Sequence, residues 1–127
     1  MTSVELSMVI PVRDEIEAVE VLVSRVVSAL EHLDVESFEV IFVDDGSKDG
    51  TADRLEWLIL EEPRCQVLRL RRPLGKGDAL AAGFEASCGR WIATIDADLQ
   101  EPPEELGLLL KVARSGADLV TGWRHRR

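Results

Sequence analysis

The stretch FEVIFVDDGS at residues 38–47 decides the fold of this chain. Its first six residues are mostly β-branched or aromatic and predict a buried strand, and two aspartates, a glycine and a serine follow directly. Two other apolar runs end in the same way: residues 6–12 lead into RDE at 13–15, and residues 91–95 lead into DADLQ at 96–100. Each of these predicted strands therefore ends in acidic side chains.

The segments between the strands have the apolar spacing of helices. Apolar residues recur at steps of three and four from Ile16 to Leu33, which is typical of the buried face of a helix. Asp14 is predicted to cap this helix, with Glu17 as its capping-box partner. A further helix is predicted around residues 52–59. Another follows Gly77, with Leu80, Gly83 and Phe84 pointing inward. A last one begins at Pro102-Pro103, with Leu106, Leu109 and Leu110 on its apolar face.

Strand and helix alternate along the whole chain, with further short strands predicted at 67–70 and 118–121. This alternation predicts an α/β fold: a Rossmann-like, mostly parallel sheet flanked by helices, with right-handed crossovers, in a single domain over residues 1–127. Sheets of this kind bind ligands beyond the carboxyl ends of their strands, where the strand order reverses. With the strands in the order 3-2-1-4, the acidic strand ends would share one crevice.

The composition excludes several classes of protein. The chain has 127 residues, with 15 lysines and arginines against 24 aspartates and glutamates, and a net charge of −9. This acidic balance argues against a nucleic-acid binder, which needs a basic face for phosphates. No apolar run approaches the ~18 residues of a membrane-spanning helix, and no secretory signal is visible. Cys65 and Cys88 form no metal motif and are predicted to be reduced thiols in a cytoplasmic protein.

The segment DADLQ at 96–100 is the strongest candidate for a metal site. Alternate side chains of an extended segment point the same way, so Asp96, Asp98 and Gln100 can converge. All of them present oxygen, which Mg²⁺ and Mn²⁺ prefer, commonly with phosphate oxygens completing the shell. The alternative is that the carboxylates cap the following helix.

The acidic segment after residue 43 also has more than one interpretation. Residues 45–56 have the spacing of an EF-hand calcium loop, but they follow a predicted strand where an EF-hand needs a helix, so we reject that interpretation. Asp49 or Thr51 can cap the next helix. Asp45 leaves the strand earlier, where its carboxylate can accept a hydrogen bond from the N–H edge of a base.

Two basic positions are weaker candidates. Lys76, between Gly75 and Gly77, belongs to neither a Walker A loop nor a dinucleotide fingerprint. It either meets a phosphate at the start of a helix or is solvated. Arg124 belongs to a basic cluster at 124–127, and because it follows the predicted fifth strand it could reach the same crevice.

Taken together, these motifs resemble the nucleotide-sugar-binding half of an inverting family 2 glycosyltransferase with the A-type fold. The resemblance is to the polyprenyl-phosphate branch, which includes dolichol-phosphate mannosyltransferase and bacterial undecaprenyl-phosphate sugar transferases. It spans nearly the whole chain. The motifs that carry it, in order, are residues 9–15 (VIPVRDE), 43–51 (VDDGSKDGT), 75–84 (GKGDALAAGF), 96–104 (DADLQEPPE) and 122–124 (GWR).

The resemblance implies a role for each matching residue. Pro11, Arg13 and Glu15 would line the base and ribose pocket, although members often have an aromatic residue at the place of Arg13. Val43 and Asp45 would contact the base. Asp96, Ala97 and Asp98 would bind the ribose, the diphosphate and the metal, and Asp98 would be the catalytic carboxylate. Gln100 would be a further metal ligand, and Arg124 would contact the donor's phosphates.

The implied reaction is metal-dependent transfer of a sugar, with inversion, from a UDP- or GDP-linked donor to a polyprenyl phosphate at a membrane surface. Mg²⁺ or Mn²⁺ is the implied cofactor, and the inner face of the membrane the implied location. About as much sequence again follows in the family, so the chain is predicted to be a donor-binding half, incomplete at its C-terminus. The alternatives are a non-catalytic or truncated nucleotide-sugar-binding module and, from the D-x-D, a phosphatase of the aspartyl-phosphate type. The oligomeric state is left open.

Overall fold

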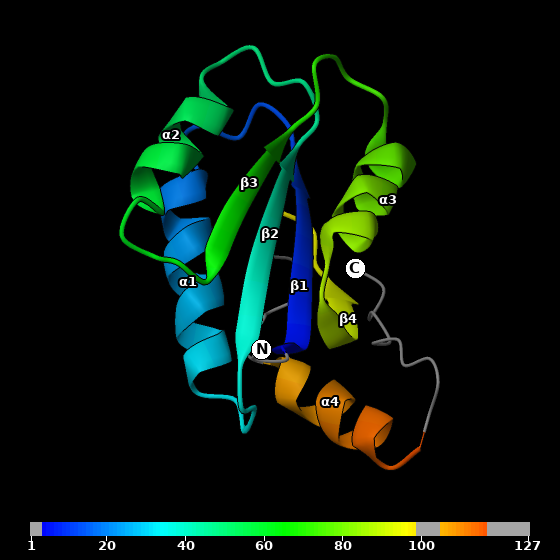
Figure 1. The fold of residues 1–127 in the computed structure, drawn as a ribbon. Helices are drawn as coiled ribbons and strands as arrows, with labels where there is room; N and C mark the ends of the chain where they lie inside the picture. Colours follow the sequence, from blue (N-terminus) through cyan, green and yellow to red (C-terminus); the bar gives the residue numbers. More distant parts are fainter. Residues whose placement is uncertain (1–3, 99–104, 117–127) are drawn as a thin grey trace, which may run out of the picture.

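The computed structural model of the chain describes residues 4–98 and 105–116. Strands and helices alternate, as predicted (Figure 1). They are β1 (Val4–Val12), α1 (Val19–Glu31), β2 (Phe38–Asp44), α2 (Thr51–Leu58), β3 (Cys65–Arg69), α3 (Lys76–Ala86), β4 (Gly89–Thr94) and α4 (Leu106–Arg114). The predicted strand at 118–121 and the helix start at Pro102-Pro103 lie outside the described residues.

The described strands form a parallel sheet, which confirms the predicted α/β class. Their order is β3-β2-β1-β4, the order under which the acidic strand ends were expected to share one crevice. Strand β1 is central and pairs with β2 on one side and β4 on the other. Its last residue, Val12, lies opposite Asp44 of β2, and Val9 lies opposite Thr94 of β4. The carboxyl ends of these strands therefore meet at one edge of the sheet.

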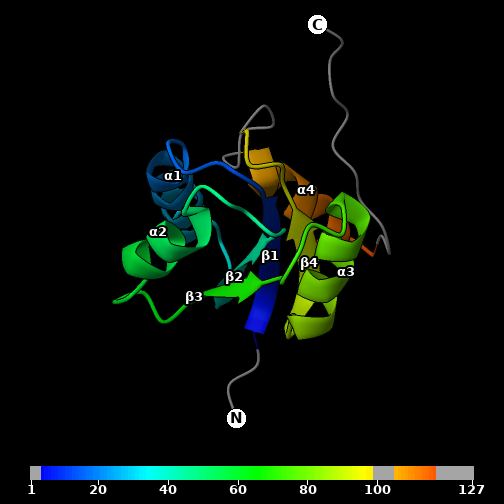
Figure 2. The ribbon, with the colours of Figure 1, turned by 90° about the horizontal axis from the view of Figure 1, so that it is seen from above.

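Helices cover both faces of the sheet (Figure 2). Helices α1 and α2 lie on one side of it and α3 on the other. Side chains of β1 alternate between the two layers: Met8 and Ile10 join the larger buried cluster, which includes Leu22 of α1, whereas Val9 joins the smaller cluster with Ala79 of α3. This two-residue alternation is the reason why a continuous apolar run serves two cores.

Helix α1 does not begin where the sequence predicted. Its N-cap is Ala18, which makes no side-chain capping bond, so the predicted capping box of Asp14 and Glu17 is wrong. Asp14 instead has a left-handed backbone (φ 50°), and its carboxylate accepts a hydrogen bond from Lys48 N at 2.8 Å. The Asp14 carboxylate thus binds the amide of Lys48, 34 residues away in the sequence, and does not cap the helix that local spacing predicted.

Helix α3 packs against the sheet through small residues. Ala79 and Gly83 are buried, whereas Phe84 is 43% exposed, so the predicted inward position of Phe84 is wrong. A Cβ at Gly83 would lie 2.3 Å from Val9 Cγ1. The backbone of the helix thus approaches β1 more closely than any larger side chain would allow.

We expect Gly83→Ala to lower the free energy of unfolding by about 1–3 kcal/mol, because the added methyl group overpacks against Val9. Urea denaturation measures this change. Gly77→Ala is the matched control in the same helix: a Cβ there meets no atom within 4 Å, so this variant should be neutral or slightly stabilising. Equal stability of the two variants would contradict the close packing of α3.

We also expect stability to fall at alkaline pH through Cys65, which is buried at the start of β3. Burial raises the pKa of this thiol to about 12 from 9.0. The unfolded chain therefore loses the thiol proton above pH 9 while the folded chain keeps it, so unfolding is favoured by up to about 1.4 kcal/mol per pH unit. Denaturation curves between pH 8 and 10 should show this slope in Cys88→Ala but not in Cys65→Ala.

Candidate functional site

A hollow of about 330 Å³ lies at the carboxyl ends of the strands. Segments that follow three of the strands, together with the start of α3, contribute to it. Its lining is Pro11, Val12, Arg13, Glu15, Asp45, Gly75, Lys76, Asp96, Ala97 and Asp98. The acidic ends that the sequence predicted to meet, at residues 45, 96 and 98, share this hollow.

Asp45 forms part of the floor and holds a neighbouring loop. It is only 5% exposed, and its two carboxylate oxygens accept hydrogen bonds from Leu74 N (2.8 Å) and Gly75 N (3.1 Å). Its own N–H donates to Val12 O at 2.9 Å. Asp45 thus places the start of α3 beside the end of β1, and its lone pairs are not exhausted by two donors.

The loops after β1 and β2 are tied together by side chains of the second loop and of the first residue of α2. Asp14 N donates to Ser47 Oγ (2.8 Å), Glu15 N to Thr51 Oγ1 (2.9 Å) and Ile16 N to Asp49 Oδ2 (3.2 Å). These bonds hold the backbone of Glu15, which lines the hollow, and of the residues on either side of it. Sequence reasoning missed this role of Ser47, Asp49 and Thr51; their abundance in a short loop was the available signal.

The predicted capping by Asp49 or Thr51 takes a different form. The N-cap of α2 is Gly50, in a left-handed conformation (φ 93°), and no side chain caps the helix. Asp49 instead accepts hydrogen bonds from the amide N–H and from the hydroxyl of Thr51. The Thr51 hydroxyl is the main reason that the pKa of Asp49 lies below its usual range.

An ion pair joins two sides of the hollow. Lys76 is the first residue of α3, and its Nζ donates to Asp96 Oδ1 beyond the end of β4. The side chains are 60% and 33% exposed, respectively. Asp98, two residues further on, is exposed and also lines the hollow.

Not every predicted site residue reaches this hollow. Val43 is fully buried in the smaller core cluster, with Val9, Ile41 and Ala79, and is not part of the lining. This placement gives it no exposed side chain for the predicted base contact. Gln100 and Arg124 lie outside the described residues.

Two carboxylates of the hollow are of the type that binds a divalent cation together with a ligand. Asp96 and Asp98 supply carboxylate oxygens, but within residues 4–98 and 105–116 no group of three or more His, Cys, Asp or Glu side chains could hold a metal ion by itself. Mg²⁺ and similar ions are commonly held by one or two carboxylates together with substrate phosphates. The residues present therefore fit a cation that arrives with a phosphorylated ligand.

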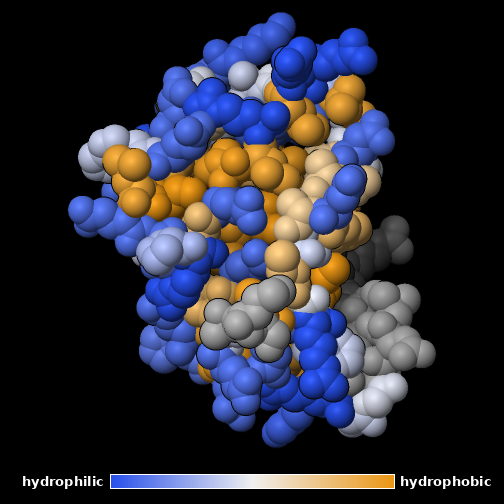
Figure 3. Space-filling model, viewed as in Figure 1, coloured by the Kyte–Doolittle hydropathy of each residue, from blue (hydrophilic) through white to orange (hydrophobic). Residues whose placement is uncertain are grey.

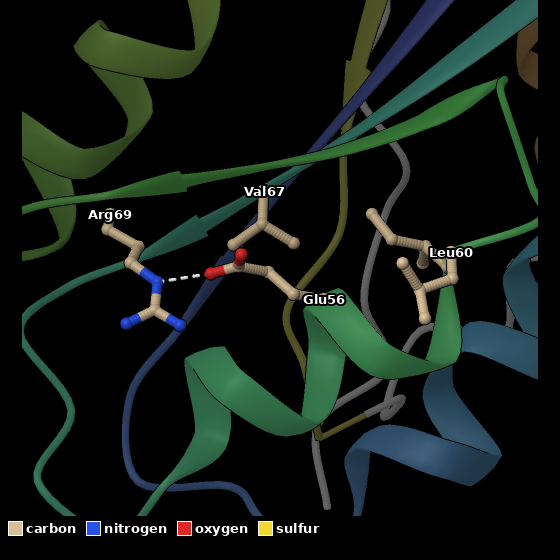
Figure 4. A pocket seen from close by; sticks show the side chains of 5 residues that line it. Glu56, Leu60, Val67 and Arg69 are labelled. Atoms are coloured by element: carbon tan, nitrogen blue, oxygen red, sulfur yellow. Dashed lines mark hydrogen bonds and ion pairs between the residues drawn. The ribbon is translucent and has the colours of Figure 1, made fainter.

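A second, larger hollow of about 540 Å³ lies between α2 and the edge strand β3 (Figure 4). Ile59, Leu60 and Val67 give it apolar walls, and its charged groups, Glu56 and Arg69, are bonded to each other. Figure 3 shows apolar side chains gathered on this face of the molecule. The hollow lies away from the acidic strand ends, and its charged groups are already paired, so it is not the candidate site.

The chain matches a family model over nearly its whole length. The model described as "Glycosyl transferase family 2" matches residues 7–127. None of the helices in the described part of the chain is long and apolar enough to cross a membrane.

Several curated relatives share the name undecaprenyl-phosphate 4-deoxy-4-formamido-L-arabinose transferase. The protein of this name from Serratia proteamaculans is 40% identical over 124 residues, which is 97% of this chain and 38% of the relative. The one from Pseudomonas fluorescens is 42% identical over 123 residues, 96% of this chain and 36% of the relative. The chain thus spans little more than a third of the length of these relatives.

Solved structures share the fold at lower identity. A mannosyltransferase from Pyrobaculum calidifontis in complex with GDP-Man and Mn²⁺ has a TM-score of 0.71 and 21% identity, over 87% of this chain and 32% of that one. S. aureus TarS 1–349 in complex with UDP-GlcNAc has a TM-score of 0.64 and 22% identity, over 87% of this chain and 30% of that one. At this identity the likeness shows a shared fold.

We expect Thr51→Val to loosen the tie between the two loops, because it removes the acceptor of Glu15 N and the hydroxyl donor to Asp49. Amide hydrogen exchange at Glu15 should accelerate about tenfold or more, and the pKa of Asp49, measured by NMR titration, should rise towards 3.8. In the unaltered chain the contribution of the Asp49 carboxylate to the tie is complete above that pH and is lost as pH falls through the lowered pKa of Asp49.

Thr94→Val is the matched control for this variant, since Thr94 is exposed at the end of β4 and outside the lining of the hollow. It should change neither quantity. Unaltered exchange at Glu15 in Thr51→Val would show that the hydroxyl does not hold the loop.

Proposed function

The chain belongs to glycosyl transferase family 2, and on that basis we propose that it is the donor-binding part of an inverting, metal-dependent enzyme that transfers a sugar from a nucleoside-diphosphate sugar to a polyprenyl phosphate. The resemblance noted in the sequence is confirmed at the level of the family, and the A-type glycosyltransferase fold is confirmed by the likeness to solved transferases. The single observation that carries the proposal is the hollow that gathers Asp45, Asp96 and Asp98.

The relatives support the acceptor class. Their shared name is undecaprenyl-phosphate 4-deoxy-4-formamido-L-arabinose transferase, and this chain covers 36–38% of their length. The solved structures support the donor class, because their bound ligands are GDP-Man with Mn²⁺ and UDP-GlcNAc. We assign the same chemistry here: a UDP- or GDP-linked sugar as donor, and a lipid phosphate presented at the inner face of a membrane as acceptor.

In this proposal the base and ribose lie over the end of β1. Arg13 can stack its planar guanidinium on the base, and Asp45 can accept a base N–H with a remaining lone pair. Pro11 and Glu15 form the adjoining wall, and Val43 supports the wall from the core. The hydrogen bonds that tie residues 14–16 to the β2–α2 loop hold this wall in place before the donor binds.

The diphosphate lies between Lys76 and the Asp96–Asp98 segment, beside Ala97. A divalent cation held by Asp96 and Asp98, with Gln100 as a further ligand, would act as a Lewis acid for the departing diphosphate. Lys76 can donate to a phosphate oxygen at the start of α3, where the amide groups of the helix also favour negative charge. Arg124 is assigned to the same phosphates. Asp98 is the carboxylate on which transfer depends most.

A phosphate acceptor removes the need for a catalytic base in the proposed reaction. A phosphate monoester has a second pKa near ~6 and is already an anion at neutral pH. Its oxygen can attack the anomeric carbon without losing a proton to the protein. A sugar hydroxyl acceptor would need a base, and none of the lining residues is needed for that role here.

A second candidate function is a donor-binding module that catalyses no transfer by itself. The observation that favours it is that the chain spans 38% of a relative that carries the name of a whole transferase. Both functions predict nucleotide binding in the same hollow. Radiolabelled UDP- or GDP-sugar with undecaprenyl phosphate separates them, because only the enzyme produces labelled lipid.

We expect Asp98→Asn to weaken Mn²⁺-dependent binding of UDP or GDP by at least about tenfold, since the cation loses one of its few protein ligands. Isothermal titration calorimetry with and without Mn²⁺ measures the effect. Asp34→Asn, which makes the same change at an exposed position outside the hollow, is the control and should bind like the unaltered chain. Unchanged nucleotide affinity in Asp98→Asn would refute the metal role of this segment.

A further inference from the structure

The ion pair between Lys76 and Asp96 links the segments that follow the two edge strands of the described sheet. Lys76 begins the helix that follows β3, and Asp96 follows β4. Because β3 and β4 are the two edge strands of the described sheet, the contact closes the hollow across the ends of the central strands. The Asp45 carboxylate accepts a hydrogen bond from Gly75 N and so holds the main chain next to Lys76 in place.

The lysine side chain has room to leave this contact. It is 60% exposed, and a Cβ at either flanking glycine, Gly75 or Gly77, would meet no atom within 4 Å. A lysine carries its charge on a flexible four-carbon stem, and an exposed ion pair is weak. Breaking the ion pair with Asp96 therefore costs little free energy when the ammonium group can bind another anion.

Asp96 is also one of the two carboxylates that the hollow offers to a divalent cation. An ammonium group and a divalent cation at the same carboxylate repel each other, so the two compete for Asp96. A bound diphosphate changes this competition, because its oxygens accept charge-assisted hydrogen bonds and give the displaced ammonium a new partner within the same hollow.

We propose that Lys76 is an exchangeable counter-ion of the donor site: it neutralises Asp96 while the hollow holds no donor, and transfers to the donor's diphosphate when a divalent cation takes the carboxylate. The exchange rests on the proposed function. It makes metal and nucleotide bind cooperatively, because a cation alone must break the ion pair without compensation, whereas a cation with a diphosphate need not. Lys76 thereby selects the metal–diphosphate complex over the free ion.

Lys76→Met tests the exchange, since methionine keeps an unbranched stem and removes the charge. We expect Mn²⁺ alone to bind about three- to tenfold more tightly, because no ammonium competes for Asp96. At saturating Mn²⁺, UDP or GDP should bind about tenfold more weakly, because the diphosphate loses its donor. Electron paramagnetic resonance of free Mn²⁺ measures the first affinity and calorimetry the second. Opposite signs of the two changes are the signature of the exchange.

Two further variants sharpen the experiment. Lys48→Met removes the same charge from the exposed side chain in the neighbouring β2–α2 loop and should leave both affinities unchanged. Lys76→Arg keeps the charge and should restore weak Mn²⁺ binding. Unchanged or weakened Mn²⁺ binding in Lys76→Met, or the same gain in Lys48→Met, would overturn the exchange.

The outcomes also separate this inference from the proposed function. Failure of the unaltered chain to bind UDP or GDP in the presence of Mn²⁺ would overturn the proposed function, on which the exchange rests. Nucleotide binding to the unaltered chain, combined with no gain of Mn²⁺ affinity in Lys76→Met, would overturn the exchange alone.

Discussion

The structure depends on the parallel hydrogen bonding of β1 to a strand on each side. Parallel pairing brings the carboxyl ends of β2, β1 and β4 to one edge, and the register places Val12 beside Asp44 and Val9 beside Thr94. The chain returns from β1 to β2 through α1, which lies on one face, and from β3 to β4 through α3, which lies on the other (Figure 2). The strand order thus reverses at β1, and this reversal opens the hollow in which ligands of such sheets bind.

An edge with so many carboxylates would repel itself if each charge faced another. This repulsion is reduced because these carboxylates accept hydrogen bonds from nearby N–H donors. Asp45 accepts the amides of Leu74 and Gly75, Asp14 accepts Lys48 N, and Asp96 accepts from the Lys76 ammonium. The first two sets of bonds use main-chain donors, whereas the last is made by an exposed lysine side chain. The same edge therefore combines loops held by main-chain hydrogen bonds with an exposed ion pair between two side chains.

Local sequence was a good guide to the sheet and a poor guide to the loops. Apolar runs such as 38–43 predicted their strands because a buried strand needs apolar side chains on both faces. The predicted start of α1 failed because Asp14 satisfied a loop amide 34 residues away instead of its own helix. Phe84 was assigned to the core by its spacing, but α3 approaches the sheet through Ala79 and Gly83, which leaves no room there for a large ring.

The sequence by itself determined the class of fold and the chemistry of the strand ends, because apolar periodicity and acidic motifs are local properties of the chain. The strand order β3-β2-β1-β4 was decided by the pairing of strands far apart in the sequence. The family followed from the same motifs in their order along the chain. Only the tertiary structure decided which groups those side chains meet. Asp45 turned out to hold a backbone loop, Val43 to lie in the core, and Lys76 to pair with Asp96. The hydrogen-bonded partners are at least 20 residues apart in the sequence. Such bonds form only when the folded sheet brings the loops together.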